Sequence, residues 1–207
     1  MSTISIVGAG NIARAVATRA LAAGYDVQLL VRSRENGGSL AGELGGAVTV
    51  DGLGARIAGD LVVLAVPYSA AAEAVNALGN LDGKILVDST NPINAEFTGL
   101  VTAPGTSGAE AIAAVAAGAP VVKAFNSVFA GNILAGGKNG QPLDLLIAGD
   151  DADAKAAVTA FGEKTGFRVI DTGALSQSAT LEALAFLHMQ LQFTRGTNFG
   201  SAIAIID

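Results

Sequence analysis

Residues 3–31, "TISIVGAGNIARAVATRALAAGYDVQLLV", constrain the fold more than any other segment. An apolar run at residues 3–7 leads into a glycine turn, and a helical pattern of apolar residues follows from about residue 11 to residue 23. Gly24 is typical of the position just after a helix, and a second apolar run covers residues 26–31. Two strands joined through a helix form a βαβ unit, in which the strands are parallel. The sequence therefore predicts a parallel sheet covered by helices.

The same alternation continues through most of the chain. Continuous apolar runs, typical of strands covered on both faces, occur at residues 47–50, 61–66, 84–88, 120–124, 144–148 and 167–170. Helical patterns lie between them at residues 69–78, 107–117 and 153–164. Ser107 and Glu110 form a capping box for the second helix, and Asp150 or Asp151 can cap the third. This order predicts an α/β fold with a Rossmann-type, doubly wound, mostly parallel sheet.

We expect one sheet domain at residues 1–172 and a small C-terminal helical region at residues 173–207. The second part begins with a helical apolar pattern and ends in an apolar tail interrupted by glycine. No low-complexity linker separates the two parts, so the helical region should pack directly on the sheet domain and complete a cleft for a second substrate.

The composition excludes several classes of chemistry. The 207 residues include no cysteine and a single histidine, so we expect no disulfide, no thiol nucleophile and no metal site. The formal charge of −6 argues against nucleic acid as the main partner. The longest apolar stretches are too short or too interrupted to span a membrane, and there is no signal-peptide pattern. We therefore expect a cytoplasmic protein with no membrane partner.

The glycine turn has the form G-x-G-x-x-A, with Gly8, Gly10 and Ala13 between a strand and a helix. In this context Gly8 permits the tight turn, Gly10 lets the backbone approach a pyrophosphate, and Ala13 lets the helix lie close to the strand. Backbone N–H groups at the start of the helix would then meet the anion. The alternative is a turn that only reverses the chain, and the complete βαβ context disfavours it.

Arg32, Ser33 and Arg34 follow the second strand directly. In dinucleotide-binding folds an acidic residue at this place accepts a hydrogen bond from the ribose 2′-hydroxyl and selects NAD. Here Asp26 lies at the start of the strand, and Glu35 lies beyond the basic pair. Two guanidiniums can fork onto phosphate oxygens, and the serine hydroxyl can donate a further hydrogen bond. The segment therefore predicts NADP(H) as the coenzyme; solvated loop charges are the alternative.

Three further strand ends supply candidates for the rest of a dinucleotide site, because ligands of open α/β sheets lie beyond the carboxyl ends of the strands. The candidates are Ala65, Val66 and Pro67 in "LAVPYSA", Ser89, Asn91 and Pro92 in "VDSTNPIN", and Ala124 and Asn126 in "VVKAFNSVFA". Singly, each fits ordinary loop chemistry, since Asn-Pro forms turns and Ser and Asn satisfy backbone groups. Together they predict a partly polar pocket around a nicotinamide ring.

The single histidine, His188, lies among apolar helical neighbours in "ALAFLHMQLQF" and is interpreted as a packed structural residue. Arg195 ends the same pattern beside a glycine, where a C-cap role and an interface role are equally open.

Several of these segments together resemble one known family. The segments "ISIVGAGNIARAVA", "VVLAVPY", "ILVDSTNPIN", "VVKAFNSVFA", "IAGDDADAKAAV" and "LEALAFLHMQLQFTRGTNFG", with the Arg-Ser-Arg triplet, are similar to the coenzyme F420-dependent NADP oxidoreductases over essentially the whole chain. The resemblance implies an N-terminal Rossmann domain, a small C-terminal helical part and a homodimer. The NADP contacts that it implies are Ala9, Gly10, Asn11, Ile12, residues 32–34, Val66 and Pro67, with Ala124 and Asn126 near the nicotinamide.

The resemblance also implies hydride transfer between NADP(H) and coenzyme F420, a deazaflavin. Because "YSAA" and "DSTNP" stand where archetypal members carry bulkier residues, a flavin is a second expected acceptor. Hydride transfer between two flat rings needs stacking and exclusion of water, so we predict no catalytic side chain and no metal.

Two other functions stay open. An NADPH-dependent reductase of a small carbonyl or imine would need a positioned proton donor, for which Tyr25, Tyr68 and Lys123 are the candidates. The alternative outside the enzymes is a non-catalytic NADP(H)-binding sensor or partner subunit.

Overall fold

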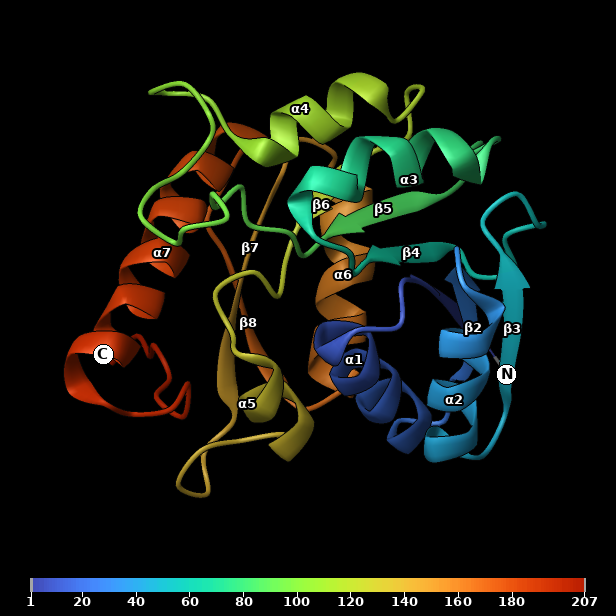
Figure 1. The fold of residues 1–207 in the computed structure, drawn as a ribbon, viewed down its shortest axis with the longest axis horizontal. Helices are drawn as coiled ribbons and strands as arrows, with labels where there is room; N and C mark the ends of the chain where they lie inside the picture. The colour runs from blue at the N-terminus through green and yellow to red at the C-terminus, as the bar shows by residue number, and fades with distance from the viewer. Residues whose placement is uncertain (1, 207) are drawn as a thin grey trace.

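The protein, seen in a computed structural model that describes residues 2–206, is built on an eight-stranded sheet (Figure 1). The strand order is β3-β2-β1-β4-β5-β6-β7-β8. The strands are β1 (Thr3–Val7), β2 (Asp26–Val31), β3 (Val48–Gly52), β4 (Leu61–Leu64), β5 (Ile85–Asp88), β6 (Val121–Lys123), β7 (Leu143–Gly149) and β8 (Phe167–Asp171). The predicted α/β fold with a Rossmann-type, mostly parallel sheet is confirmed.

The direction of the strands decides where their ends meet. All neighbours from β3 to β6 pair in parallel, so their carboxyl ends lie at one edge of the sheet. The pairing of β6 with β7 is antiparallel, with Val122 opposite Gly149, and β7 and β8 are parallel to each other. The ends of β1, β2, β4, β5 and β6, where the candidate residues lie, are thus brought to the same edge.

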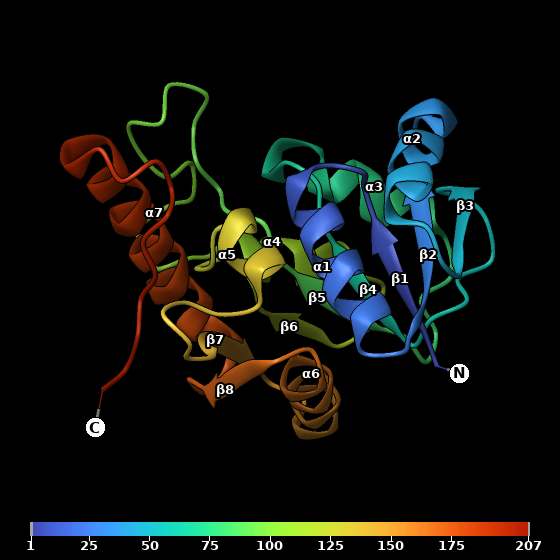
Figure 2. The same ribbon diagram turned by 90° about the horizontal axis from the view of Figure 1, so that it is seen from below.

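Helices cover both faces of the sheet. They are α1 (Asn11–Ala22), α2 (Arg34–Leu44), α3 (Ala71–Leu78), α4 (Gly108–Val115), α5 (Ala130–Ala135), α6 (Ala152–Lys164) and α7 (Ser178–Arg195), with short 3-10 turns η1 (Tyr68–Ala70) and η2 (Leu175–Gln177). Buried residues of α1, α2, α5 and α6 form one core with the sheet, and those of α3 and α4 form a second core on the other face (Figure 2). This two-sided cover explains why the strand sequences are apolar without alternation.

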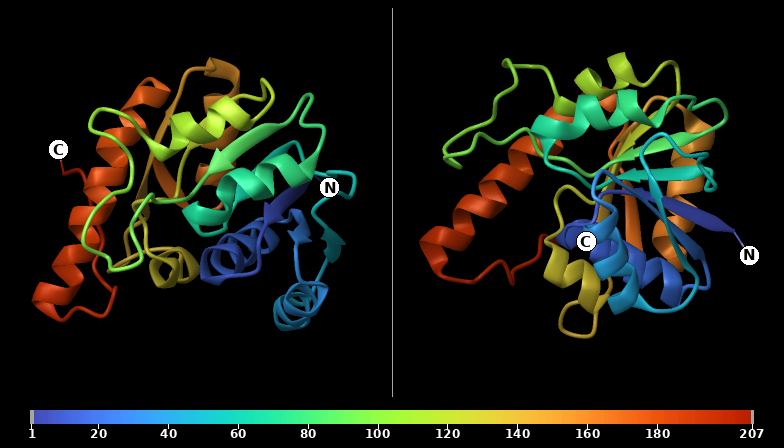
Figure 3. Two further views of the ribbon diagram at one scale, coloured as in Figure 1. Left: turned by 45° about the horizontal axis from the view of Figure 1, so that its top comes forward. Right: turned by 45° about the vertical axis from the view of Figure 1, so that its right-hand side comes forward.

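The long C-terminal helix α7 stands at the end of the molecule beside β7 and β8 (Figure 3). Leu181 packs against Leu146 and Ala148 of β7, on the face opposite to α6. Residues 196–206 follow without regular structure. Asn132 donates to the Ser201 carbonyl at 2.7 Å and the Ile205 N–H donates to Asp144 at 2.6 Å, so this tail is attached to α5 and β7. The proposed division after residue 172 falls between β8 and η2 and remains a prediction.

Two helices were missed by the sequence analysis, and several strands are shorter than predicted. The α2 sequence "RENGGSLAGEL" is rich in glycine, which disfavours helices, yet a Cβ on Gly37 would lie 2.7 Å from a Val50 methyl carbon, so close packing on the sheet requires glycine. The six-residue α5 is too short to show helical periodicity. Ala65, Val66 and Ala124, placed in strands by their apolar neighbours, lie in loops just after β4 and β6.

The predicted caps can be compared with the observed ones. Ser107 and Glu110 form the predicted capping box at the start of α4. Asp151 caps α6 by accepting from the Ala154 N–H at 2.8 Å, whereas Asp150 accepts from the Leu175 N–H at 2.8 Å. Within residues 2–206, no helix is both long and apolar enough to cross a membrane.

Candidate functional site

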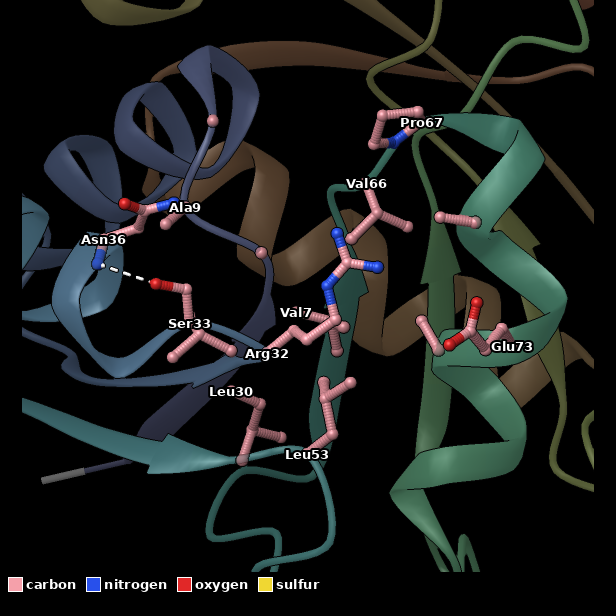
Figure 4. Close-up of a pocket in the computed structure, with 15 residues that line it drawn as sticks. Val7, Ala9, Leu30, Arg32, Ser33, Asn36, Leu53, Val66, Pro67 and Glu73 are labelled. Carbon is pink, nitrogen blue, oxygen red and sulfur yellow. Dashed lines mark hydrogen bonds between the residues drawn. The ribbon is translucent and has the colours of Figure 1, made fainter.

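A cavity of about 370 Å³ lies at the carboxyl edge of the sheet, where the strand order reverses between β1 and β4 (Figure 4). Open α/β sheets bind their ligands at this topological switch point, and the volume is within the range of small-molecule sites. The lining residues come from the ends of β1, β2 and β4, from the loop after β3, and from α2 and α3. They are Val7, Gly8, Ala9, Gly10, Leu30, Val31, Arg32, Ser33, Asn36, Leu53, Val66, Pro67, Ala70, Glu73 and Ala74.

The glycine turn forms the end of the cavity nearest to α1. Gly8 has φ of 115°, a conformation that L side chains rarely adopt, and an added Cβ would collide with the Ala65 carbonyl. Gly10 is the N-cap of α1 and offers no side-chain acceptor, and the first turn of the helix contains no acidic residue. Ala13 is fully buried, as its predicted packing role requires. The N–H groups at the start of α1 therefore form an electropositive end wall suited to an anion.

The basic triplet is split by the start of α2. Ser33 is the N-cap of this helix, and its Oγ accepts from the Asn36 N–H at 3.3 Å. Arg32 and Ser33 line the cavity, and in Figure 4 the Arg32 guanidinium extends into it. Arg34 is exposed in the first turn of α2 and is not among the lining residues. The structure thus brings two members of the triplet into the cavity and leaves the third outside.

The opposite wall comes from residues that the sequence analysis did not single out. Leu53 follows β3, and Ala70, Glu73 and Ala74 belong to η1 and α3. In Figure 4, Glu73 lies across the cavity from Ser33 and Asn36. A signal for this wall was available, because the helix after β4 must border the crevice once β1 and β4 are neighbours.

The remaining predicted residues lie near the cavity but outside its lining. Asn11 and Ile12 are in the first turn of α1, and Ala65 lies beneath Gly8. Ser89, Asn91, Pro92, Ala124 and Asn126 lie at the ends of β5 and β6, further along the same edge. Their roles as coenzyme contacts stay predictions.

Polar groups at the ends of β5 and β6 hold these loops together. The Asn126 amide donates to Asn91 Oδ1 at 3.1 Å and to the Leu181 carbonyl at 3.1 Å, and Asn91 donates to the Asn126 carbonyl at 2.8 Å. The Ser89 hydroxyl donates to the Leu64 carbonyl at 2.8 Å. Asn126 Oδ1 is buried and has no hydrogen-bond partner within residues 2–206. One acceptor is therefore left available for a donor outside the described chain.

The residue between Ala124 and Asn126 has unusual backbone geometry. Phe125 has φ of 66°, the left-handed region that favours glycine, although its side chain is an aromatic ring. The ring is fully buried and makes edge contacts with Phe161 and Phe167 at centroid distances of 6.2 and 5.6 Å. Packing of the Phe125 ring thus stabilises a backbone conformation that costs of order 1–3 kcal/mol. Residues with strained backbones of this kind are found most often at functional sites.

A buried charge cluster lies beneath the same edge of the sheet. Lys123 Nζ donates to Asp88 Oδ2 at 2.8 Å, to the Thr90 carbonyl at 2.7 Å and to Glu182 Oε1 at 2.7 Å. The three charged side chains are 0% exposed. Glu182 also accepts from the backbone N–H groups of residues 108 and 109 at the start of α4. An ammonium has three protons, all used here, so Lys123 is a structural cation and not a proton donor to a substrate.

Tyr68, a second candidate acid, packs above this cluster. A Cβ on Gly108 would lie 2.7 Å from the Tyr68 ring, so the glycine makes room for it. Burial raises the pKa of Tyr68, the carboxylates of Glu182 and Asp88 raise it further, and Lys123 opposes them. At neutral pH the phenol therefore stays protonated and is a weaker acid than an exposed tyrosine.

His188 lies on α7 and packs against the start of α5 and the C-terminal tail. Its ring stacks on Phe129 at a centroid distance of 4.3 Å, and Nε2 lies 2.8 Å from Ser201 Oγ. Burial lowers the pKa of His188, and the backbone of Ser127 partly opposes this shift. These contacts agree with a structural role. Arg195 is the last residue of α7, followed by Gly196 in the left-handed C-cap conformation.

The geometry of the glycine turn agrees with the result of comparison with protein families. Residues 3–92 match the family described as "NADP oxidoreductase coenzyme F420-dependent". The match covers the part of the chain from β1 to the loop after β5. Over these residues the chain is similar to an oxidoreductase family whose description names NADP.

Individual relatives extend the similarity beyond the matched segment. The chain is 33% identical to the F420-dependent NADP reductase of Methanocaldococcus jannaschii over 61% of its length and 59% of the relative. It is 30% identical to the metalloreductase STEAP3 of Rattus norvegicus over 87% of its length but 36% of the relative. Less than two thirds of each of these relatives is therefore represented in this chain. A solved structure of a candidate F420-dependent NADP reductase from Arthrobacter sp. FB24 superposes with a TM-score of 0.81, at 25% identity, over 93% of this chain and 94% of that one.

Among residues 2–206 there is no group of three or more His, Cys, Asp or Glu side chains that could hold a metal ion.

Proposed function

We propose that this protein transfers a hydride between NADP(H) and a flat heteroaromatic acceptor, coenzyme F420 or a flavin. The observation that carries the proposal is the position of Arg32 and Ser33 at the end of β2, inside the cavity that begins at the glycine turn. A pyrophosphate on the N–H groups of α1 places the adenosine ribose near the end of β2. A cation and a hydroxyl there favour a 2′-phosphate, whereas NAD selection would need an acid.

The nicotinamide half would extend along the sheet edge toward β5 and β6. Asn126 Oδ1 supports this placement, because it is a buried acceptor without a partner and a nicotinamide carboxamide carries two N–H donors. Its orientation is fixed, since the amide nitrogen already donates to Asn91 and to the Leu181 carbonyl. We keep Ser89, Asn91, Pro92 and Ala124 as further parts of this region, and Asn11, Ile12, Ala65 and Arg34 as parts of the NADP site.

The choice of hydride acceptor rests on two observations: the candidate proton donors are unsuited to a carbonyl substrate, and the names of relatives contain F420-dependent NADP reduction. Ring-to-ring hydride transfer requires stacking and a dry site but no side-chain acid. The names of two relatives contain F420-dependent NADP reduction, and a third is a metalloreductase whose length this chain covers only in part. We therefore prefer a deazaflavin, with a flavin as the second choice. A carbonyl or imine substrate is disfavoured because Lys123 is saturated and the pKa of Tyr68 is raised.

The proposal includes a homodimer and a cytoplasmic location. The support for the dimer is the outer face of α7, where Leu187 is 56% and Leu191 is 42% exposed one helical turn apart. An exposed surface of this kind on an otherwise half-buried helix fits a second copy of the chain.

The coenzyme is tested with single arginine variants. Arg32→Ala should weaken NADPH binding by about 2 kcal/mol and leave NADH binding nearly unchanged, because only NADPH carries the 2′-phosphate. Arg34→Ala is the matched control, and its effect should be smaller because Arg34 lies outside the cavity. Dissociation constants from fluorescence titration measure both. Equal losses for NADPH and NADH in Arg32→Ala would contradict the assignment.

The acceptor is tested by NADPH oxidation with coenzyme F420, FMN, FAD and a panel of small carbonyls and imines. We expect turnover with F420 or a flavin. Turnover with a carbonyl or imine only would favour the reductase alternative. NADPH binding without turnover on any acceptor would favour a sensor or partner subunit.

A further inference from the structure

Glu73 is the single carboxylate among the described residues that line the cavity, and nothing in the proposed hydride transfer uses it. We infer that Glu73 recognises the adenine base of NADP(H) by accepting a hydrogen bond from its exocyclic amino group. This inference rests on the proposed function and adds a specificity-determining residue to it.

The place of the base follows from the places of the phosphates. The pyrophosphate belongs at the glycine turn and the 2′-phosphate at Arg32 and Ser33, so the ribose lies between them. The base must then occupy the remaining part of the cavity, between the end of β2 and α3. Its walls there are apolar and are formed by Leu30, Leu53, Ala70 and Ala74.

An adenine base between apolar walls needs hydrogen-bond partners for the polar groups along its edge. Adenine presents two N–H donors on its 6-amino group, and leaving a donor without an acceptor costs about 1–3 kcal/mol. An ionised carboxylate only accepts hydrogen bonds, so Glu73 suits an amino group and opposes a carbonyl oxygen at the same position. Hypoxanthine carries a 6-oxo group and an N1–H in place of the 6-amino group and the N1 acceptor of adenine, and it keeps the sugars, phosphates and nicotinamide of the dinucleotide unchanged.

Two structural roles for Glu73 make different predictions. In the first turn of α3 its charge can interact with the helix dipole, an effect on stability that does not distinguish between bases. An ion pair with Arg32 would act on the 2′-phosphate, but none joins these residues among the described salt bridges. Neither role makes binding depend on the group at position 6 of the purine.

The test compares NADP⁺ with nicotinamide hypoxanthine dinucleotide phosphate by calorimetric titration of the full chain. Wild type should bind the adenine form about tenfold more tightly. Glu73→Gln should reduce this preference to less than about threefold, because an amide can accept from the amino group or donate to the oxo group. Glu35→Gln is the control: it removes the same charge in the first turn of α2, outside the cavity lining, and should keep the wild-type preference.

The outcomes separate the inference from the proposed function. Equal affinity of wild type for the two dinucleotides overturns the inference, and so does a Glu73→Gln variant that keeps the tenfold preference or changes both affinities by one factor. Failure of wild type to bind either dinucleotide would instead overturn the proposed function. Because the preference is a ratio measured on one folded sample, a change in stability of the variant does not alter it.

Discussion

Substitution by alanine should have different effects at Gly8 and at Gly10. A Cβ on Gly8 would collide with the Ala65 carbonyl and would sit on a backbone at φ of 115°, whereas a Cβ on Gly10 meets no atom within 4 Å. Gly8→Ala should therefore lower the free energy of unfolding by about 1–3 kcal/mol. Gly10→Ala should leave unfolding unchanged but abolish most NADPH binding, because the methyl group occupies the space of the pyrophosphate.

Urea denaturation and NADPH titration of both variants measure these effects. Binding by Gly10→Ala at the wild-type affinity would show that no phosphate approaches this turn.

His188 gives a pH dependence whose sign follows from its environment. Burial lowers its pKa in the folded protein below the ordinary value of 6.5, so the unfolded chain takes up a proton first as the pH falls. The contribution of His188 to stability is complete above about pH 6.5 and is lost as the pH falls toward the folded pKa. His188→Gln should therefore lose less stability than wild type between pH 7 and pH 5, as followed by urea denaturation.

The same variant tests the structural role of the histidine. Since the ring contacts Phe129 and Ser201, His188→Gln should keep the rate of hydride transfer within about tenfold of wild type. A collapse of turnover with the fold intact would place His188 in the chemistry.

At the scale of single residues, the sequence predicted the glycine turn better than the opposite wall of the cavity. The spacing of Gly8, Gly10 and Ala13 sets a local backbone geometry, which a short pattern can specify. Glu73 comes from a helix that joins the pocket through the strand order, and the left-handed backbone of Phe125 depends on packing against α6 and β8. Neither the position of Glu73 in the cavity wall nor the backbone conformation of Phe125 is determined by residues nearby in the sequence.

At the scale of elements, the Lys123 cluster joins the sheet to α4 and α7. Removing one member leaves unpaired charges at 0% exposure, which typically costs about 3–5 kcal/mol. Lys123→Met should therefore lower the free energy of unfolding by this amount. Lys84→Met is the control, because Lys84 pairs with Asp60, whose side chain is 90% exposed, and such pairs contribute about 0–1 kcal/mol.

Thermal and urea unfolding of the two variants provide the comparison. Equal stability of Lys123→Met and Lys84→Met would mean that the buried cluster is not required for folding.

Prediction of the helices succeeded where the periodic pattern of apolar residues extended over several turns. It failed where glycine residues or the shortness of the helix obscured that pattern. All eight strands were found because each contains a short run rich in apolar residues. Helix α2 was missed because its glycines, of which Gly37 is needed for close packing on β2 and β3, oppose the helical propensity on which the prediction depends. The direction of β7 was also not encoded locally, since an antiparallel and a parallel neighbour have the same apolar sequence.

At the scale of the whole molecule, the exposed face of α7 should decide the oligomeric state. Replacing both Leu187 and Leu191 with Glu places charges on the surface proposed to join two copies. Wild type should sediment as a dimer and the double variant as a monomer in analytical ultracentrifugation. Glu73→Gln, which changes a residue of α3 in the cavity lining, is a suitable control and should sediment as wild type does. A monomeric wild type would remove the dimer from the proposal.

The carboxylate that α7 contributes to the interior limits how this protein can be recombined. Position 182 neutralises a lysine that belongs to the sheet, although the two lie 59 residues apart in sequence. A chimera that takes residues 173–206 from another protein must therefore supply an acid at this position, or Lys123 loses one of its two carboxylate partners and the N–H groups of residues 108 and 109 lose their acceptor. Exchange of the C-terminal segment, whether by evolution or by design, is then restricted to donors that carry this acid.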